Sequence, residues 1–299
     1  MNTKPDLSQL EHTYLSANGI RLHVVQAGPA DGPLVVLLHG FPEFWFGWRH
    51  QIGALTQAGY RVVVPDQRGY NLSDKPKGVD NYRVATLAAD VVGLLDALRR
   101  EQCFLVGHDW GAAVAWETAI RYPGRIQKLA ILNVPHPDVM TRFILSNPAQ
   151  MRKSWYIFFF QLPLIPEASL RANDWNLAVK MLTGSGQPGS FTEADIQQYR
   201  QAWWCKDSMK SMINWYRAAF RGALRGPWNP AKVVARWVSI PTLILWGKND
   251  VALSYQMAQP SVDLCDDGRL VTFEQATHWV QHDEAEVVNQ HLLVFFAVN

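Results

Sequence analysis

One aspartate in this chain stands in a setting that suits a nucleophile. Asp109 lies in the stretch VGHDWGAAVAW (residues 106–116), with Gly107 two positions before it and Gly111 two positions after it. A sharp turn from a strand into a helix leaves no room at these flanking positions for a side chain larger than hydrogen. The pattern therefore predicts a carboxylate nucleophile at Asp109. An ordinary helix-capping aspartate is the alternative that this stretch alone leaves open.

Three further segments carry groups that such a nucleophile would need. HGFP (39–42) follows the first buried run of the chain, Asp250 closes LILWGKND, and His278 stands in ATHWVQHDE after the last run. A histidine oriented by an acid can remove a proton from water, and the order nucleophile, acid, histidine is one that enzymes with this kind of turn use. We therefore predict that Asp109, Asp250 and His278 act together.

Other assignments of the acid and the histidines were weighed. Three aspartates near the histidine in sequence lie in polar loop or helix stretches and are less suitable than Asp250: Asp263, Asp266 and Asp283. His278 and His282 are four residues apart, but HWVQH lacks the glutamate of the H-E-x-x-H zinc motif, and no third ligand is evident. We predict no metal site, and a packed, hydrogen-bonded role for His108.

The elements that must position these residues can be read from short apolar runs. Six such runs alternate with helical patterns, at residues 33–40, 60–66, 103–109, 128–134, 241–247 and 269–275. Continuous apolar runs bounded by Gly, Pro and Asp are typical of a parallel sheet covered on both faces. Residues 86–100 predict a helix, and Asn18-Gly19 predicts a two-residue hairpin ahead of the sheet. The predicted fold class is α/β, with a doubly wound, mostly parallel sheet.

The strand pattern is interrupted from about Pro135 to about Trp237 by a segment rich in aromatic residues and helix-compatible polar residues. We predict a helical cap at residues 136–236, inserted between two parts of an α/β core at 1–135 and 237–299. Ligands of open α/β sheets bind beyond the carboxyl ends of the strands, so this cap would cover the site. Four aromatic residues beside HGFP either wall a pocket or pack the core against the cap: Phe44, Trp45, Phe46 and Trp48.

On these motifs the chain resembles the α/β-hydrolase-fold epoxide hydrolases of the soluble bacterial type, over nearly its whole length. HGFP matches the family's H-G-x-P, GHDWG (107–111) its nucleophile motif, and HWVQ (278–281) its histidine segment. Two tyrosines of the family's cap also find matches, Tyr156 in a WYxxxFQ pattern and Tyr216 in NWYR. Relatives often carry glycine where this chain has Asn71, a residue type that tolerates the left-handed conformation.

The resemblance implies hydrolysis of an epoxide to a vicinal diol without a cofactor. Asp109 would open the ring while Tyr156 and Tyr216 protonate its oxygen, and His278 would then activate the water that cleaves the resulting ester. A carboxylate suits this chemistry because its ester has a carbonyl that water can attack, whereas a serine would form an ether. Two backbone N–H groups would stabilise the oxyanion of the second step, those of Phe41 and Trp110.

Two other functions remain open at this point. Haloalkane dehalogenases resemble the chain in fold and nucleophile, but a halide needs no proton, whereas a phenol of pKa about 10 can protonate a departing alkoxide. Many dehalogenases carry Asn where Phe41 stands, and fluoroacetate dehalogenases carry Arg where Trp110 stands. The other possibility is a non-catalytic member of the fold in which the pocket only binds a ligand.

Composition restricts the partners. The 299 residues carry 28 basic and 26 acidic side chains, a net charge of +2, with no basic block. We therefore predict neither a nucleic-acid nor a membrane partner. The three cysteines are far apart, the amino terminus is polar, and the apolar run at 155–166 is too short to span a bilayer. We expect a cytoplasmic protein, a monomer or homodimer, that takes an apolar epoxide and water.

Overall fold

A computed structural model of the chain describes residues 10–225 and 233–297. The parts of the predicted core at residues 1–9 and 298–299, including most of the polar amino terminus, lie outside the described residues. So does the part of the predicted cap at residues 226–232. The predicted domain boundaries stay predictions.

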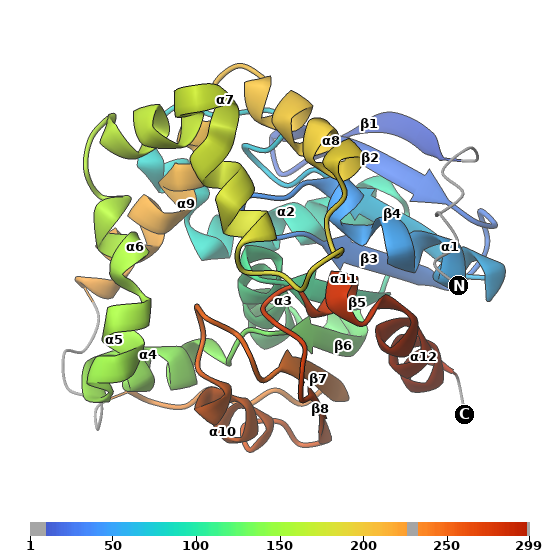
Figure 1. Cartoon of the computed structure of the whole chain (residues 1–299). Helices are drawn as coiled ribbons and strands as arrows, with labels where there is room; N and C mark the ends of the chain where they lie inside the picture. Colours follow the sequence, from blue (N-terminus) through green and yellow to red (C-terminus); the bar gives the residue numbers. More distant parts are fainter. Residues whose placement is uncertain (1–9, 226–232, 298–299) are drawn as a thin grey trace.

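A single eight-stranded sheet forms the centre of the molecule (Figure 1), in the order β1-β2-β4-β3-β5-β6-β7-β8. The first two strands are antiparallel to their neighbours, and all later pairs are parallel. The strands are β1 (Glu11–Ala17), β2 (Ile20–Ala27), β3 (Leu34–Leu38), β4 (Arg61–Pro65), β5 (Cys103–His108), β6 (Ile126–Leu132), β7 (Thr242–Gly247) and β8 (Gly268–Phe273). All six apolar runs are therefore strands, and the predicted sheet is confirmed.

The hairpin prediction is also confirmed. Asn18 and Gly19 connect β1 to β2, and both have positive φ angles, 47° and 77°. Two consecutive left-handed residues match the right-handed twist of the strands that they join, and Asn and Gly adopt this conformation most easily.

Helices cover both faces of the sheet. One face packs on α1 (Arg49–Gln57) and α12 (Ala285–Phe296), which share a buried cluster with the strands. The other face packs on α2 (Val84–Ala97) and α3 (Trp110–Arg121), whose cluster continues into the cap. The predicted helix at 86–100 corresponds to α2. The shorter helices of the core are α10 (Ala258–Val262) and α11 (Val280–Asp283), with the 3₁₀ turns η1 (Trp45–Trp48), η2 (Val79–Tyr82), η3 (Pro123–Arg125) and η5 (Tyr255–Met257).

Among the described residues, six helices follow β6 and precede β7, within the segment predicted as a cap. They are α4 (Pro137–Ser146), α5 (Pro148–Lys153), α6 (Trp155–Phe159), α7 (Ile165–Thr183), α8 (Glu193–Trp204) and α9 (Ser208–Ala223). Helix α7 is broken in its middle, where three consecutive residues have positive φ: Asn173, Asp174 and Trp175. Helix α8 begins with a capping box, in which Thr192 and Asp195 bind each other's backbone N–H groups. Among the described residues no helix is both long and apolar enough to cross a membrane.

The aromatic residues after HGFP pack the core against the cap. Tyr199 of α8 makes edge-to-face contacts with Phe44 and Phe46, at ring distances of 5.5 and 6.0 Å. The indole N–H of Trp203, also in α8, donates to the Pro42 carbonyl oxygen at 2.6 Å. Of the two interpretations of these aromatic residues, contact with the cap therefore describes Phe44 and Phe46.

Candidate active site

The turn between β5 and α3 holds Asp109 in a strained backbone conformation, with φ 49° and ψ −122°. Its flanking glycines are required by the packing. A Cβ on Gly107 would stand 2.5 Å from the Gly111 carbonyl oxygen, and a Cβ on Gly111 would stand 2.1 Å from the Leu38 carbonyl oxygen. The Asp109 side chain does not bond to the start of α3. The helix-capping alternative is therefore wrong for this residue.

The Asp109 carboxylate lies between a backbone donor and a histidine. Its Oδ1 accepts a hydrogen bond of 2.7 Å from the Phe41 N–H, and its Oδ2 lies 3.4 Å from His278 Nε2. Trp110 is the first residue of α3, where a backbone N–H has no acceptor within its own helix. Of the two predicted oxyanion donors, the Phe41 N–H thus contacts the carboxylate, and the Trp110 N–H belongs to the next residue in the chain.

His278 also contacts the predicted acid. Its Nδ1 lies 2.7 Å from Asp250 Oδ2, and Asp250 is almost fully buried in the turn after β7. The other Asp250 oxygen accepts hydrogen bonds from the backbone N–H groups of Ala252 and Leu253, at 2.7 and 2.8 Å. The three alternative aspartates lie elsewhere: Asp263 and Asp266 are exposed, and Asp283 binds Thr277 and Ser190.

The charges of this triad support one another. Burial disfavours the ionised carboxylate of Asp109, but His278, His108 and the Phe41 N–H together outweigh it and lower the pKa of Asp109. Burial also disfavours the charged imidazole, yet Asp250 and Asp109 together raise the pKa of His278 from 6.5 to about 10. At neutral pH the arrangement is therefore a cationic histidine between two carboxylates.

The two predicted tyrosines meet on the cap side of the site. The rings of Tyr156 in α6 and Tyr216 in α9 lie edge to face, 5.9 Å apart, and Tyr216 lies 5.0 Å from Trp110. Burial raises the pKa of both phenols, and the Asp109 charge raises it further. Both groups consequently stay protonated at neutral pH and can donate hydrogen bonds.

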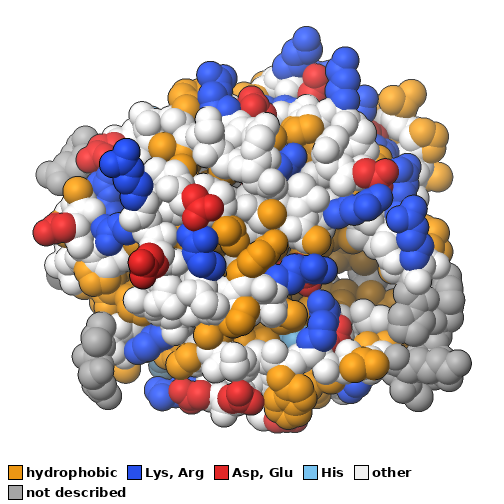
Figure 2. All heavy atoms as spheres, turned by 180° about the vertical axis from the view of Figure 1, so that it is seen from behind, with side chains coloured by type: hydrophobic (Ala, Val, Ile, Leu, Met, Phe, Trp, Pro, Cys, Tyr) orange, Lys and Arg blue, Asp and Glu red, His pale blue; other side chains and the backbone are white. Residues whose placement is uncertain are grey.

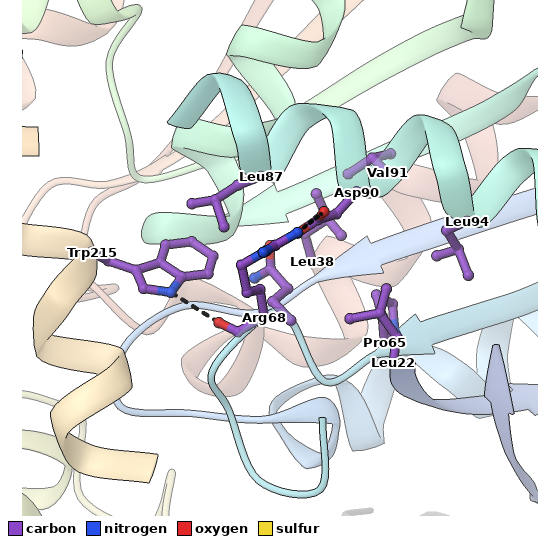
Figure 3. Close-up of a pocket in the computed structure, with 10 residues that line it drawn as sticks. Leu22, Leu38, Pro65, Arg68, Leu87, Asp90, Val91, Leu94 and Trp215 are labelled. Atoms are coloured by element: carbon purple, nitrogen blue, oxygen red, sulfur yellow. Dashed lines mark hydrogen bonds and ion pairs between the residues drawn. The ribbon is translucent and has the colours of Figure 1, made fainter. Parts of the chain in front are cut away.

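The neighbour of Tyr216 fixes α9 to the core. Figure 3 shows the indole N–H of Trp215 donating to the Arg68 carbonyl oxygen, at 3.0 Å, beside the buried Arg68–Asp90 ion pair. The cavity that these residues line has about 10 Å³ of free volume, close to the least that a water molecule needs. It is too small for a substrate. Its walls instead anchor the helix that carries Tyr216.

Two residues near the site were missed by the sequence analysis. Asn133, at the end of β6, has a positive φ of 54°, and its amide donates to Asp250 Oδ2 at 2.9 Å and accepts from the Gly247 N–H at 3.0 Å. Glu43, directly after HGFP, is almost fully buried and accepts from the Tyr199 hydroxyl at 2.7 Å. A lone acidic residue in an aromatic stretch was the available signal for Glu43. Asn133 gave none beyond its place after a strand.

The other histidines near the site are occupied by hydrogen bonds. His108 Nε2 lies 2.8 Å from the His278 carbonyl oxygen, which confirms its predicted packed role. His282 Nε2 lies 2.8 Å from Glu43. In residues 10–225 and 233–297, no group of three His, Cys, Asp or Glu side chains is arranged to hold a metal ion.

The sheet order, the strained Asp109 turn and the His278–Asp250 pair define an α/β-hydrolase-fold protein with an aspartate in the nucleophile position. Comparisons agree, since a family model described as the alpha/beta hydrolase fold matches residues 33–285. The chain is 45% identical to the AB hydrolase superfamily protein YfhM of Bacillus subtilis, over 94% of this chain and 96% of that protein. It is 39% identical to epoxide hydrolase 1 of Caenorhabditis elegans, over 98% of this chain and 72% of the relative.

A solved structure is similar too. The epoxide hydrolase of Bacillus megaterium in complex with an inhibitor superimposes with a TM-score of 0.87 at 31% identity, covering 96% of this chain and all of that one. The chain therefore belongs to the epoxide hydrolases of the α/β-hydrolase family.

Proposed function

We propose that the protein hydrolyses an apolar epoxide to a vicinal diol through a covalent ester of Asp109. The observations that support this most directly are the 3.4 Å distance from His278 Nε2 to Asp109 Oδ2 and the nearness of Asp109 to the two cap phenols, whose pKa its charge raises in addition to burial. The carboxylate can open the ring while a phenol protonates the ring oxygen, and the histidine can then activate the water that cleaves the ester.

In the first half, an Asp109 oxygen attacks one ring carbon from the side opposite the ring oxygen. The C–O bond of the ring breaks, and its electrons pass to the ring oxygen, which takes a proton from Tyr156 or Tyr216. The lowered pKa of Asp109 keeps it ionised and ready to attack. The neighbouring aromatic side chains, Phe41 and Phe160, exclude water from the tyrosines and favour an apolar substrate.

In the second half, water attacks the carbonyl carbon of the ester, and His278 takes the proton. Ester formation removes the negative charge of Asp109, which is one of the two charges that raise the pKa of His278. The pKa of His278 consequently falls in the intermediate, the imidazole releases its proton to solvent, and the neutral ring can act as a base. The N–H groups of Phe41 and Trp110 stabilise the oxyanion. Its collapse breaks the bond between the acyl carbon and the diol oxygen, which takes the proton now held by His278, and the new carboxyl group returns its proton to the tyrosinate, so that the diol and the Asp109 carboxylate are released.

The tyrosines also favour an epoxide over a haloalkane. A departing halide is a very weak base and needs only hydrogen-bond donors, whereas a departing alkoxide needs a proton. Burial, and after it the Asp109 charge, raises the pKa of both phenols; the second contribution disappears as the ester forms, so their acidity rises when the ring oxygen requires the proton.

Product analysis tests the reaction. Purified protein is incubated with a panel of apolar epoxides that includes styrene oxide, and in parallel with a bromoalkane. We expect diol from the parent protein and none above background from Asp109→Ala, since the residual rate without the nucleophile falls by about 10⁴-fold or more. Halide release without diol formation would make the protein a dehalogenase. The absence of both products would favour the non-catalytic member of the fold.

His278→Gln separates the two halves of the reaction. This variant retains the nucleophile but lacks the base, so we expect one equivalent of covalent adduct on Asp109 and little turnover. Intact-protein mass spectrometry after incubation with the epoxide measures the adduct. Oxygen-18 incorporated from labelled water into Asp109 during multiple turnovers of the parent protein would further support the ester. Diol formation by the parent without such labelling would instead indicate direct attack of water on the epoxide.

A further inference from the structure

The outer side of the cap beside α6 exposes apolar side chains where a monomeric protein usually shows few. Trp155 and Phe158 on α6 are 64% and 51% exposed, and Leu164 in the following turn is 74% exposed. Tyr156 lies between the two aromatic residues in sequence but faces Tyr216. One helix thus presents a catalytic candidate inward and large apolar side chains outward.

The end of helix α9 extends this surface. The rings of Phe158 and Phe220 lie 5.8 Å apart, and the Arg217 guanidinium of α9 donates to the carbonyl oxygens of Phe160 and Leu162, at 3.0 and 2.7 Å. These contacts attach the end of α6 to α9, and both helices lie on the left side of Figure 1. We call the exposed surface the α6 face; its apolar residues are Trp155, Phe158, Leu162, Leu164, Ile165 and Leu224.

The α6 face is also positively charged. Residues 148–165 and 217–225 contain five Lys and Arg and no Asp or Glu, in a chain whose totals are 28 and 26. Two carboxylates outside these segments lie nearby: Glu167 pairs with Arg217, and Asp80 pairs with Arg83 and feels the charges of Arg225 and Arg221, all of which lower its pKa. Arg152, Arg221 and Arg225 are exposed and form no direct ion pair with the described residues. Seen from behind, the molecule mixes Lys and Arg with Asp and Glu over much of its surface (Figure 2). Net charge alone conceals this local asymmetry.

Exposed Trp, Phe and Leu combined with arginine are the groups that bind at the boundary between lipid headgroups and acyl chains. A second copy of the chain fits less well. A symmetric dimer formed through this face would place its exposed arginines against the same arginines, and the two nearby carboxylates, Asp80 and Glu167, already pair with Arg83 and Arg217. We propose that the α6 face docks the protein on an anionic lipid surface.

This docking does not depend on the proposed reaction, but it gives the reaction a source of substrate. Apolar epoxides partition into lipid, and Tyr156 lies on the inner side of the same helix that would contact the lipid. The prediction that no membrane partner exists rested on the lack of a basic block in the sequence. The basic surface arises only when α5, α6 and α9 come together.

Vesicle flotation tests the proposal, with full-length protein and phosphatidylcholine vesicles with or without phosphatidylglycerol. We expect binding to the anionic vesicles only, weakened by salt. Trp155→Ser combined with Phe158→Ser should abolish it. Arg152→Gln combined with Arg221→Gln should weaken it roughly thirtyfold, as expected for the loss of two cations at an anionic surface. Trp204→Ser is the matched control, because Trp204 is 51% exposed on α8, outside the face.

Diol formation from a water-soluble epoxide should stay unchanged in all these variants, which tests the reaction separately. If the parent protein does not hydrolyse epoxides, flotation still measures vesicle binding, and thermal unfolding shows whether each variant is folded. Failure of the parent to bind anionic vesicles would overturn the proposal, as would binding that neither pair of substitutions reduces. A dimer in light scattering that Trp155→Ser and Phe158→Ser convert to a monomer, without vesicle binding, would assign the face to a second copy instead.

Discussion

The two sides of the site are held in place by different kinds of interaction. On the core side, backbone geometry leaves little freedom: Asp109 occupies a strained turn that only the flanking glycines permit, and Asp250 is held by two backbone N–H groups. On the cap side, Tyr156 and Tyr216 are held by contacts between aromatic rings. Ring contacts are less directional than hydrogen bonds. The core therefore fixes the carboxylate, the histidine and the acid more rigidly than the cap fixes the two phenols.

The largest test of this comparison removes the cap's proton donors and leaves the core intact. We expect Tyr156→Phe and Tyr216→Phe each to lower kcat/KM for an epoxide by about 10- to 100-fold, and the double variant by about 10³-fold, in line with the loss of general-acid catalysis. Tyr82→Phe is the control, because Tyr82 is buried and donates to the Pro76 carbonyl oxygen away from the site. A double variant with near-parental kcat/KM would show that the tyrosines only shape the pocket.

A smaller effect is expected from Asn133, which positions Asp250 without contacting substrate. Loss of its amide removes one hydrogen bond to Asp250 Oδ2. We therefore expect Asn133→Gly to lower kcat about tenfold, because the ester is hydrolysed more slowly. Glycine tolerates the positive φ of this position, whereas alanine does not. Asn133→Ala therefore adds backbone strain of about 1 kcal/mol to the loss of the amide. Rapid-quench measurement of the ester, together with urea unfolding, distinguishes the two effects. If both variants lose only stability, the residue has no positioning role.

The same contrast explains what the sequence could predict. The apolar runs indicated the strands, and residues that favour turns indicated the Asn18-Gly19 hairpin and the Asp109 turn. Each of these signals depends on residues close together in the chain. The partners of Asp250 and Glu43 depend on segments brought together by the sheet and the cap, such as Asn133 with Asp250 and Tyr199 with Glu43. No local pattern encodes these contacts. The tyrosines were found through resemblance to a family, since ring packing in the cap leaves no distinctive spacing.

The pH dependence of stability tests the charges on the core side. In the folded protein the pKa of His278 is raised from 6.5 to about 10, chiefly by Asp250 and Asp109 against the effect of burial. A raised pKa of a basic group stabilises the fold fully below the unfolded value of 6.5, and this contribution is lost as the pH rises through about 10. The difference in unfolding free energy between the parent and His278→Gln should therefore shrink from pH 6.5 to pH 10, by on the order of 4 kcal/mol.

Urea unfolding of both proteins at each pH measures this difference, and comparison within the pair removes the titration of other groups. His291→Gln, which replaces a partly exposed histidine outside the site, controls for the loss of a histidine as such. A difference that stays constant, or grows with pH, would mean that His278 is neutral in the free protein. The ester would then form beside an imidazole that is already a base, and hydrolysis would not require the fall in the pKa of His278 that accompanies the loss of the Asp109 charge.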